Sequence, residues 1–163
     1  MSNEKPSEHQ FREMLSLIPT AVSIVAVRNI GDETVSICTI SSLTSIASKG
    51  EINYFGFSLK SGSKTLQDLK INEYFEIFIL KKSGLQFANI FSSSRIEKSA
   101  KVNSYGKLDD LFYDLKSNST LNFQCKFISA TNVGDSEFII SLFLKGKILS
   151  IDEPLLYCRR SYF

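Results

Sequence analysis

The stretch LNFQCKFISATNVGDSEFIISLFLKGKIL, residues 121–149, decides the fold class. Residues 121–130 and 137–149 are rich in apolar, aromatic and β-branched side chains, which strands favour. Between them lies Asn132-Val133-Gly134-Asp135, a turn-forming group of the kind that joins antiparallel strands. The stretch therefore predicts a long β-hairpin and, with it, an antiparallel sheet.

Further strands are predicted on the N-terminal side of this hairpin. Apolar runs rich in β-branched and aromatic residues lie at residues 20–27, 34–40, 52–59 and 74–80, and each has the length of a strand. Gly56 interrupts the third run, which indicates a bulge or a close approach of another chain segment. Six or seven strands with few helices predict a mainly β protein, an antiparallel barrel with helical decoration.

The N-terminal segment predicts a short amphipathic helix over residues 7–18. Ser7 and Gln10 have the spacing of a capping box, in which each side chain bonds to the other residue's backbone amide. Pro19 ends the helix. Apolar residues recur on one face, and we expect this stripe to pack against another surface. The stripe consists of Phe11, Met14, Leu15 and Ile18.

Two more short helices are expected, at residues 65–69 and 85–91. Residues 92–107 are polar and show no clear period, which predicts an irregular, mobile excursion. With 163 residues in total, the chain is expected to form one domain over residues 1–163.

Composition excludes several classes of function. The net charge is +2 and no long basic run is present, so we expect no nucleic-acid surface. No apolar run approaches 18 residues and the polar N-terminus lacks a signal segment, so we expect a cytoplasmic protein without a membrane span. Cys38, Cys125 and Cys158 lack the spacing of a zinc site, and the single histidine, His9, leaves little material for a nucleophile pair.

Two neutral or basic polar segments are candidates for ligand binding. TISSLTSIAS, residues 39–48, has six hydroxyl side chains and no charge. SLKSGSKT, residues 58–65, places serines, a glycine and two lysines before a predicted helix. Free amides at a helix N-terminus attract phosphate, but such segments also serve as plain helix caps. Spacing alone leaves both interpretations open.

Four segments of the chain resemble the flavin reductase family of FMN-binding split barrels. SSLTSIA follows a strand as the family's T-x-S-S-F-T-S does, and SLKSGSKT matches its S-x-S-x-T turn. EPLLYCRRSYF is similar to P-L-L-Y-x-R-x-x-Y at the C-terminus. FREMLSLIPTAVSIVAV matches F-R-x-x-x-x-x-x-P-T-G-V-x-V-V, with Ala21 in place of the usual glycine. The resemblance spans Phe11 to Tyr162.

The resemblance implies a split β-barrel that transfers hydride from NADH or NADPH to flavin, with FMN favoured over FAD. It implies that reduced flavin passes to a partner such as a monooxygenase, and that the protein is a homodimer. It assigns the flavin ring and ribityl chain to Thr39, Ile40, Ser41, Ser42, Leu43, Thr44 and Ser45. It assigns the phosphate to Ser58, Lys60, Ser61, Lys64 and Thr65. Tyr157 and Arg159 would close the site or brace the dimer.

The chain departs from the family pattern on the nicotinamide side. Many members carry Gly-Asp-His in the hairpin, where this chain has Gly134-Asp135-Ser136. An asparagine of the fourth strand is replaced by Phe78. Two alternatives to the reductase therefore remain. One is a flavin-binding barrel that acts as carrier, as sensor or with another electron donor, and the other is an interaction module in which the serines are structural caps.

Overall fold

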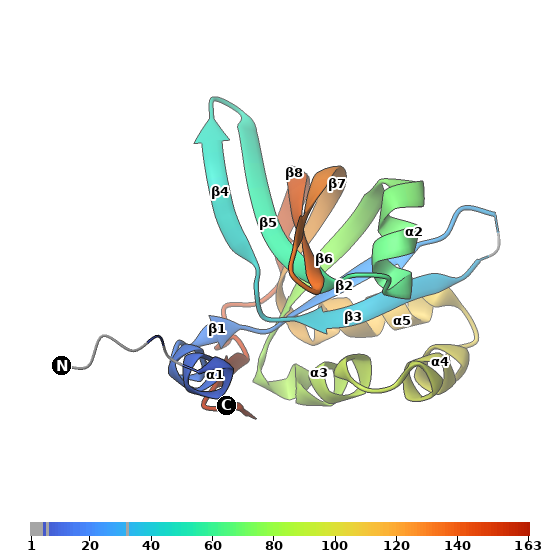
Figure 1. Ribbon diagram of the computed structural model, residues 1–163. Helices are drawn as coiled ribbons and strands as arrows, with labels where there is room; N and C mark the ends of the chain where they lie inside the picture. Colours follow the sequence, from blue (N-terminus) through green and yellow to red (C-terminus); the bar gives the residue numbers. More distant parts are fainter. Residues whose placement is uncertain (1–4, 6, 32) are drawn as a thin grey trace.

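The computed structural model describes residues 5, 7–31 and 33–163 (Figure 1). Among these residues, seven strands form an antiparallel sheet in the order β3, β2, β6, β7, β8, β5, β4. A second sheet of three strands has the order β1, β9, β10 within the same part of the chain. The strands of the large sheet are β2 Ser23–Arg28, β3 Val35–Ile40, β4 Thr44–Lys49, β5 Ile52–Lys60, β6 Tyr74–Leu80, β7 Ser119–Val133 and β8 Ser136–Ile148. Those of the small sheet are β1 Thr20–Ala21, β9 Leu156–Cys158 and β10 Ser161–Tyr162.

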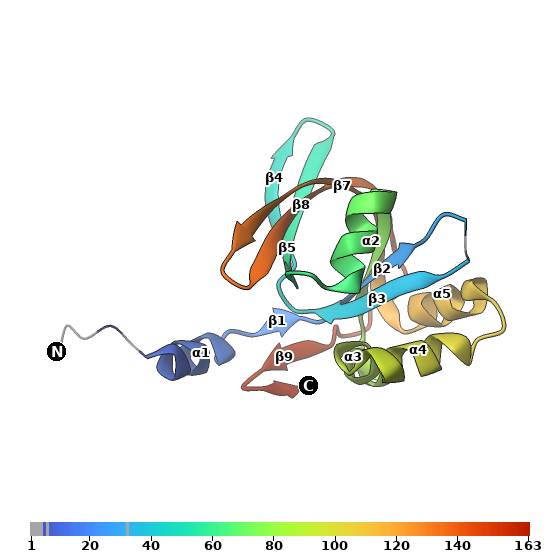
Figure 2. The ribbon, with the colours of Figure 1, turned by 45° about the vertical axis from the view of Figure 1, so that its right-hand side comes forward.

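The helices of the described chain are short. They are α1 Glu8–Ser16, α2 Lys64–Asn72, α3 Leu85–Ser92, α4 Arg95–Asn103 and α5 Leu108–Ser117, with a 3₁₀ turn at Lys82–Gly84. In both ribbon views α2 lies on one side of β3, and α3 and α4 lie on the other (Figures 1 and 2). The prediction of a mainly β split barrel with a few short helices is confirmed.

Alternating residues of the central strands build two separate cores, because side chains along a strand point to opposite faces. Ile24 and Ala26 of β2 pack with α3 and α5 through residues such as Phe87 and Leu111. The intervening Val25 and Val27 belong to a second core inside the barrel. There they pack with Phe57 of β5, Ile77 of β6 and Leu66 of α2. The near-continuous apolar sequence of β2 reflects this burial on both faces.

The two ends of the large sheet approach one another after β3. The backbone amide of Ser58 in β5 donates to Ser42 Oγ, in the turn after β3, over 2.9 Å. Beyond this bond, β4 and the adjoining end of β5 project from the barrel as a hairpin (Figure 1). All six residues of β4 are exposed. The curled sheet is therefore closed near Ser42 and open beyond it, as in a split barrel.

The predicted hairpin and N-terminal helix are both present. β7 and β8 pair through Val133 and Ser136, and Gly134 adopts a φ of 63° in the turn. Ser7 caps α1 reciprocally with Gln10, through bonds of 2.8 and 3.2 Å. None of the residues of α1 is buried, and the apolar side chains of Phe11, Met14 and Leu15 stay 51%, 61% and 48% exposed. The end of α1 is held by the C-terminal strands, since Arg159 N donates to Ser16 O over 2.6 Å. The small sheet and α1 lie side by side in Figure 2.

The expected irregular excursion at residues 92–107 is wrong, because most of it is the helix α4. Ser94 Oγ accepts from Glu97 N over 3.4 Å, and the Glu97 carboxylate accepts from Ser94 N over 3.2 Å. This capping box starts a helix whose exposed surface is polar, and its polarity concealed the period. Val102 packs against the core formed with α3 and α5.

Three further differences concern element bounds. β4 was not predicted as a strand, because its hydroxyl-rich sequence faces solvent on both sides and shows no alternation. The helix α2 is longer than residues 65–69, and α5 was not predicted.

Gly56 marks a close approach, since a Cβ there would lie 2.3 Å from Phe138 Cζ. The predicted bulge lies on the partner strand instead, between Ser45 and Ala47 of β4.

No helix in the described part of the chain combines the length and apolarity needed to cross a membrane.

Candidate functional site

A cavity of about 820 Å³ opens along the outer edge of β3, between α2 and α4. We call it the α2–α4 cavity. Its volume lies in the range of roughly 300–1,000 Å³ that is common for small-molecule sites. Most of its lining residues are polar or cationic, and a minority are apolar. It is lined by residues 34–42, by residues 58–60 and 63–65, and by Asn29, Ser92, Arg95, Lys98, Ser99, Val102 and Asn103.

The structure brings together eight of the fourteen residues that the sequence assigned to a flavin site. Those in the lining of the α2–α4 cavity are Thr39, Ile40, Ser41, Ser42, Ser58, Lys60, Lys64 and Thr65. They come from the end of β3, the end of β5 and the start of α2. Strand pairing therefore joins the two polar segments, TISSLTS and SLKSGSKT, at one place. Their role in flavin binding stays a prediction.

The other six predicted residues lie outside this lining. Leu43 packs on the barrel core, and Thr44 and Ser45 begin the projecting strand β4. Ser61 is in the turn before α2, where its amide donates to Asp135 O over 3.0 Å. Tyr157 and Arg159 belong to the small sheet and its turn, next to α1. Arg159 thus braces the N-terminal helix within one chain.

Several hydroxyls of the polar segments already have structural partners. Thr39 Oγ1 donates to Ala88 O of α3 over 2.9 Å, and Ser42 Oγ accepts the Ser58 amide described above. Thr65 is buried and hydrogen-bonds with the thiol of Cys38. These bonds tie β3 to α3, to β5 and to α2. The exposed Ser41 has no such side-chain bond to the described residues.

The N-terminus of α2 carries an unusual cap. Ser63 occupies the N-cap position with an extended backbone, yet its side chain makes no capping hydrogen bond. Its Oγ is buried and without a partner in the described structure. The first amides of a helix have no partner within the helix either, and they carry the positive end of its dipole. An oxyanion at this end of the cavity would satisfy both the orphaned hydroxyl and the amides.

Lys64, at the first helical position of α2, is oriented by a buried carboxylate. Its Nζ lies 2.6 Å from Asp68 Oδ1, while its side chain keeps 55% exposure. Asp68 also accepts from Asn29 Nδ2 over 3.1 Å and from the hydroxyl of Ser36. Burial opposes ionisation of Asp68, but hydrogen bonds from Lys64, Ser36 and Asn29 outweigh it and lower the pKa. Asp68 therefore stays charged and fixes both α2 on β3 and Lys64 at the rim.

The helix α4 contributes residues that sequence reasoning missed. Arg95, Lys98 and Ser99 lie three and four positions apart, so they share one helix face, and all three line the cavity. Arg95 and Lys98 bring the cations of the lining to four, together with Lys60 and Lys64, and no carboxylate is among the described residues of the lining. The spacing of Ser94 and Glu97 was the signal that a helix begins there. The cavity is therefore suited to an anionic ligand.

Cys38 lies in the wall of the cavity but is not a nucleophile. Burial raises the pKa of its thiol to about 11, against smaller opposing effects of the bond from Thr65 and the charge of Lys98. At neutral pH the residue is a thiol, whereas nucleophilic cysteines need the thiolate. The lining thus supplies cations and hydroxyls, and the amides at the start of α2 lie beside them.

A family model described as the flavin reductase like domain matches residues 14–163. The match covers nearly the whole chain, which therefore belongs to this family. No curated protein matches the chain in sequence.

Several solved structures share the fold at low sequence identity. The styrene monooxygenase flavin reductase from Pseudomonas putida S12 is 20% identical with a TM-score of 0.74, over 94% of this chain and 95% of the other. The flavin reductase component of a bacterial two-component tryptophan halogenase is 15% identical, with a TM-score of 0.76 over 96% and 97%. The Streptomyces globisporus C-1027 NADH:FAD oxidoreductase in complex with NAD and FAD fragments is 15% identical, with a TM-score of 0.77 over 100% and 96%.

Proposed function

We propose that the protein is an NAD(P)H-dependent flavin reductase that binds the FMN moiety of its flavin in the α2–α4 cavity. The observation that carries the proposal is the orphaned Ser63 hydroxyl at the start of α2, beside four cations. Hydrogen-bond donors and positive charge without a carboxylate are what a phosphate ester requires. Membership of the flavin reductase like domain family supports a flavin as the molecule that carries this phosphate.

In this proposal the phosphate binds at the N-terminus of α2. Lys60 and Lys64 neutralise it from one side, and Arg95 and Lys98 of α4 from the other. The turn after β3 lies against the flavin ring, and Ser41 faces its polar edge. When bound, the flavin supplies the ring that accepts a hydride from a nicotinamide. The protein's contribution is orientation and electrostatic stabilisation, so it needs no nucleophile.

Binding of FMN and of riboflavin tests the phosphate assignment, because riboflavin lacks only the phosphate. Titration of flavin fluorescence should give a Kd for FMN at least about tenfold below that for riboflavin. The double variant Arg95→Ala/Lys98→Ala should remove most of the difference. The matched control, Lys145→Ala/Lys147→Ala on β8, changes charge equally outside the cavity lining. Equal affinity of the wild-type protein for FMN and riboflavin would refute the phosphate site.

A second function is favoured by one observation in the β7–β8 hairpin. Ser136 stands where many family members have histidine, and its hydroxyl bonds to the neighbouring Asp135 over 3.1 Å. It pairs with Lys60 of β5 across the sheet, so it lies near the proposed phosphate site. A flavin-binding protein that is a carrier, or that uses another electron donor, is compatible with this change. FMN binding without NADH or NADPH oxidation would favour that alternative.

The delivery of reduced flavin to a partner enzyme is also part of the proposal. One structural relative is named as a styrene monooxygenase flavin reductase, and another as the flavin reductase component of a two-component tryptophan halogenase. By that analogy, the partner here is a flavin-dependent monooxygenase or halogenase. Free flavin added to the assay should then turn over many times per protein molecule. A single reduction of tightly bound flavin would contradict this role.

We further propose a homodimer, built from surfaces that the single chain leaves uncovered. Met14 and Leu15 of α1 and Ile18, just after it, are 61%, 48% and 57% exposed, although the sequence places them on one apolar stripe. β4 is an edge strand exposed along its whole length, and such edges are usually covered. Light scattering during gel filtration should give twice the mass of the chain. Leu15→Glu/Ile18→Glu should give the monomer, and a wild-type monomer at micromolar concentration would refute the dimer.

A further inference from the structure

Asp68 of α2 is a buried carboxylate that does not belong to the lining of the α2–α4 cavity. Only 3% of its surface is exposed, so a ligand in the cavity does not meet it directly. It is nevertheless hydrogen-bonded to three residues that do line the cavity, namely Lys64, Ser36 and Asn29. A buried charge is costly unless it is paired, and a carboxylate near an anion site also repels the anion. A carboxylate at this place therefore needs a compensating role.

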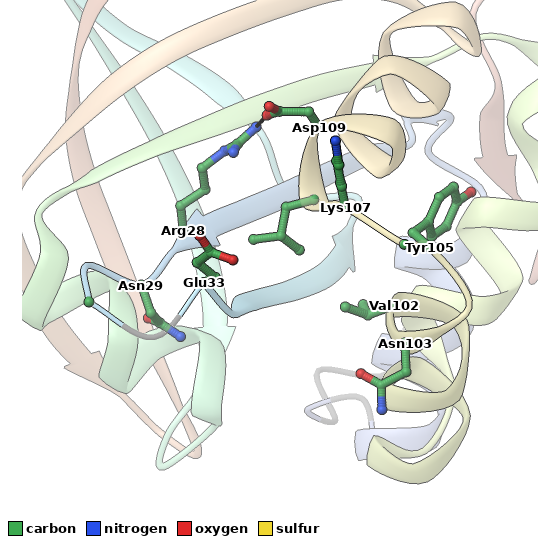
Figure 3. A pocket seen from close by; sticks show the side chains of 11 residues that line it. Arg28, Asn29, Glu33, Val102, Asn103, Tyr105, Lys107 and Asp109 are labelled. Atoms are coloured by element: carbon green, nitrogen blue, oxygen red, sulfur yellow. Dashed lines mark hydrogen bonds and ion pairs between the residues drawn. The ribbon is translucent and has the colours of Figure 1, made fainter.

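The two carboxylate oxygens of Asp68 have different partners. Oδ2 accepts from Asn29 Nδ2 over 3.1 Å and from the hydroxyl of Ser36 in β3. Asn29 lies at the start of the β2–β3 connection, where its side chain and that of Arg28 point in opposite directions (Figure 3). Oδ1 accepts from Lys64 Nζ over 2.6 Å. One oxygen thus fixes the carboxylate to the sheet, and the other oxygen holds Lys64.

Asn72, in the last turn of α2, belongs to the same network but does not contact the carboxylate of Asp68. Its Nδ2 donates to Asn29 Oδ1 and to the backbone oxygen of Asp68, both over 2.9 Å. Its Oδ1 accepts from Ile30 N over 3.0 Å. Asn72 is buried and lies outside the cavity lining. It therefore ties α2 to the β2–β3 connection without holding Lys64, which makes it a suitable control position.

Lys64 can still bind an anion while Asp68 holds it. Its ammonium group has three donors, of which Asp68 takes one, and 55% of its side chain is exposed. Among the described residues, no ion pair holds the other cations of the lining, Lys60, Arg95 and Lys98. A lysine side chain loses much rotamer entropy when it is immobilised. Because Asp68 imposes this loss during folding, less entropy is lost when a ligand binds.

We propose that Asp68 is a positioning residue, which raises the affinity of the α2–α4 cavity for phosphate by holding Lys64 at the N-terminus of α2. The inference rests on the proposed function, because the phosphate of FMN is the group that Lys64 meets there. Charge repulsion alone predicts the opposite result, since removal of a carboxylate near an anion site should tighten anion binding. The two effects differ in sign, so the affinity for FMN distinguishes them.

Fluorescence titration with FMN and riboflavin at pH 7 tests the proposal. Asp68→Asn should raise the Kd for FMN about fivefold and leave the Kd for riboflavin unchanged, because riboflavin has no phosphate. Lys64→Met should show the same loss, and the double variant should lose no more than either single one, within about twofold. Ser36→Ala loosens the same carboxylate more mildly and should raise the Kd for FMN in the same direction. The control Asn72→Ala should keep the wild-type ratio of the two Kd values, and circular dichroism checks that each variant folds.

The possible failures are distinguishable. A wild-type protein that binds neither flavin would refute the proposed function, and one that binds FMN and riboflavin equally would refute its phosphate site. If the wild-type protein prefers FMN, but Asp68→Asn binds FMN as tightly or more tightly, the positioning role alone is overturned. Additive losses in the double variant would show that Asp68 does not act through Lys64. An equal loss of the FMN preference in Asn72→Ala would show that any loosening of the network has this effect, and the assignment to Asp68 would be wrong.

Discussion

Replacing Ser63 by alanine should weaken flavin binding without lowering the stability of the ligand-free protein. Ser63 is the N-cap of α2, and a serine at this position normally stabilises a protein by about 1 kcal/mol through its bond to the helix backbone. Here the bond is missing and the hydroxyl is buried without a partner. If Ser63 binds the phosphate of the ligand, its unpaired hydroxyl destabilises the ligand-free protein and gains a hydrogen-bond partner only when the ligand binds.

The expected magnitudes follow from that geometry. An unsatisfied buried polar group costs about 1–3 kcal/mol, so removing it should leave the free energy of unfolding unchanged or raise it by about 1 kcal/mol. A hydrogen bond to a charged group contributes roughly 1.5–3 kcal/mol, while the amides of α2 remain available in the variant. We therefore expect Ser63→Ala to raise the Kd for FMN about tenfold, or by about 1.4 kcal/mol.

Urea unfolding without ligand and fluorescence titration with FMN measure the two effects. Ser94→Ala is the matched control, because Ser94 caps α4 with an intact capping box. It should lose about 1 kcal/mol of stability in the absence of ligand. If Ser63→Ala loses as much stability as Ser94→Ala and keeps its affinity for FMN, then Ser63 is an ordinary cap and the phosphate binds elsewhere.

Three other predictions concern the framework of the site. Asp68→Asn should cost about 2–3 kcal/mol in urea unfolding at pH 7, because it weakens three hydrogen bonds to a buried charge. Folding lowers the pKa of Asp68, so its carboxylate contributes fully to the free energy of unfolding above pH 3.8, the ordinary pKa of the group. This contribution is lost as the pH falls through the lowered pKa. The stability gap between wild type and variant should therefore narrow in acid, and a constant gap would contradict the assignment. Gly56→Ala should cost about 1 kcal/mol in thermal unfolding, because Phe138 must move to admit the Cβ; an unchanged Tm would show that the ring is not confined. With its pKa raised to about 11, the thiol of Cys38 should resist alkylation at pH 8, as measured by peptide mass mapping, whereas rapid labelling would mean that the thiol ionises near this pH.

The strands were predictable because their signal is local. β6 matches the predicted residues 74–80, and β7 and β8 follow from aromatic and β-branched runs on either side of Gly134. β4 gave no signal, because all six of its residues are exposed and its sequence therefore lacks an apolar alternation, although it pairs with β5. The helix α4 was missed for a related reason, since its polar surface concealed the apolar position at Val102 that packs on the core.

The candidate site was predictable only where its residues lie close together in the sequence. The segments around Ser41 and Lys60 were recognised, but Arg95 and Lys98 reach the same cavity from a helix that the sequence did not reveal. Thr39, which the sequence assigned to the flavin, lines the cavity, and its hydroxyl donates to Ala88 O, a partner that only the tertiary structure supplies. Ser63 was passed over because the predicted helix began one residue late, which hid its position as the N-cap.

An anaerobic titration of FMN-loaded protein with NADH, and separately with NADPH, tests the central claim most directly. The proposed reductase predicts that at least one of the two nicotinamides removes the visible absorbance of the bound flavin, in a ratio of about one to one. Flavin that binds to the protein and keeps its absorbance with both nicotinamides would contradict the reductase function.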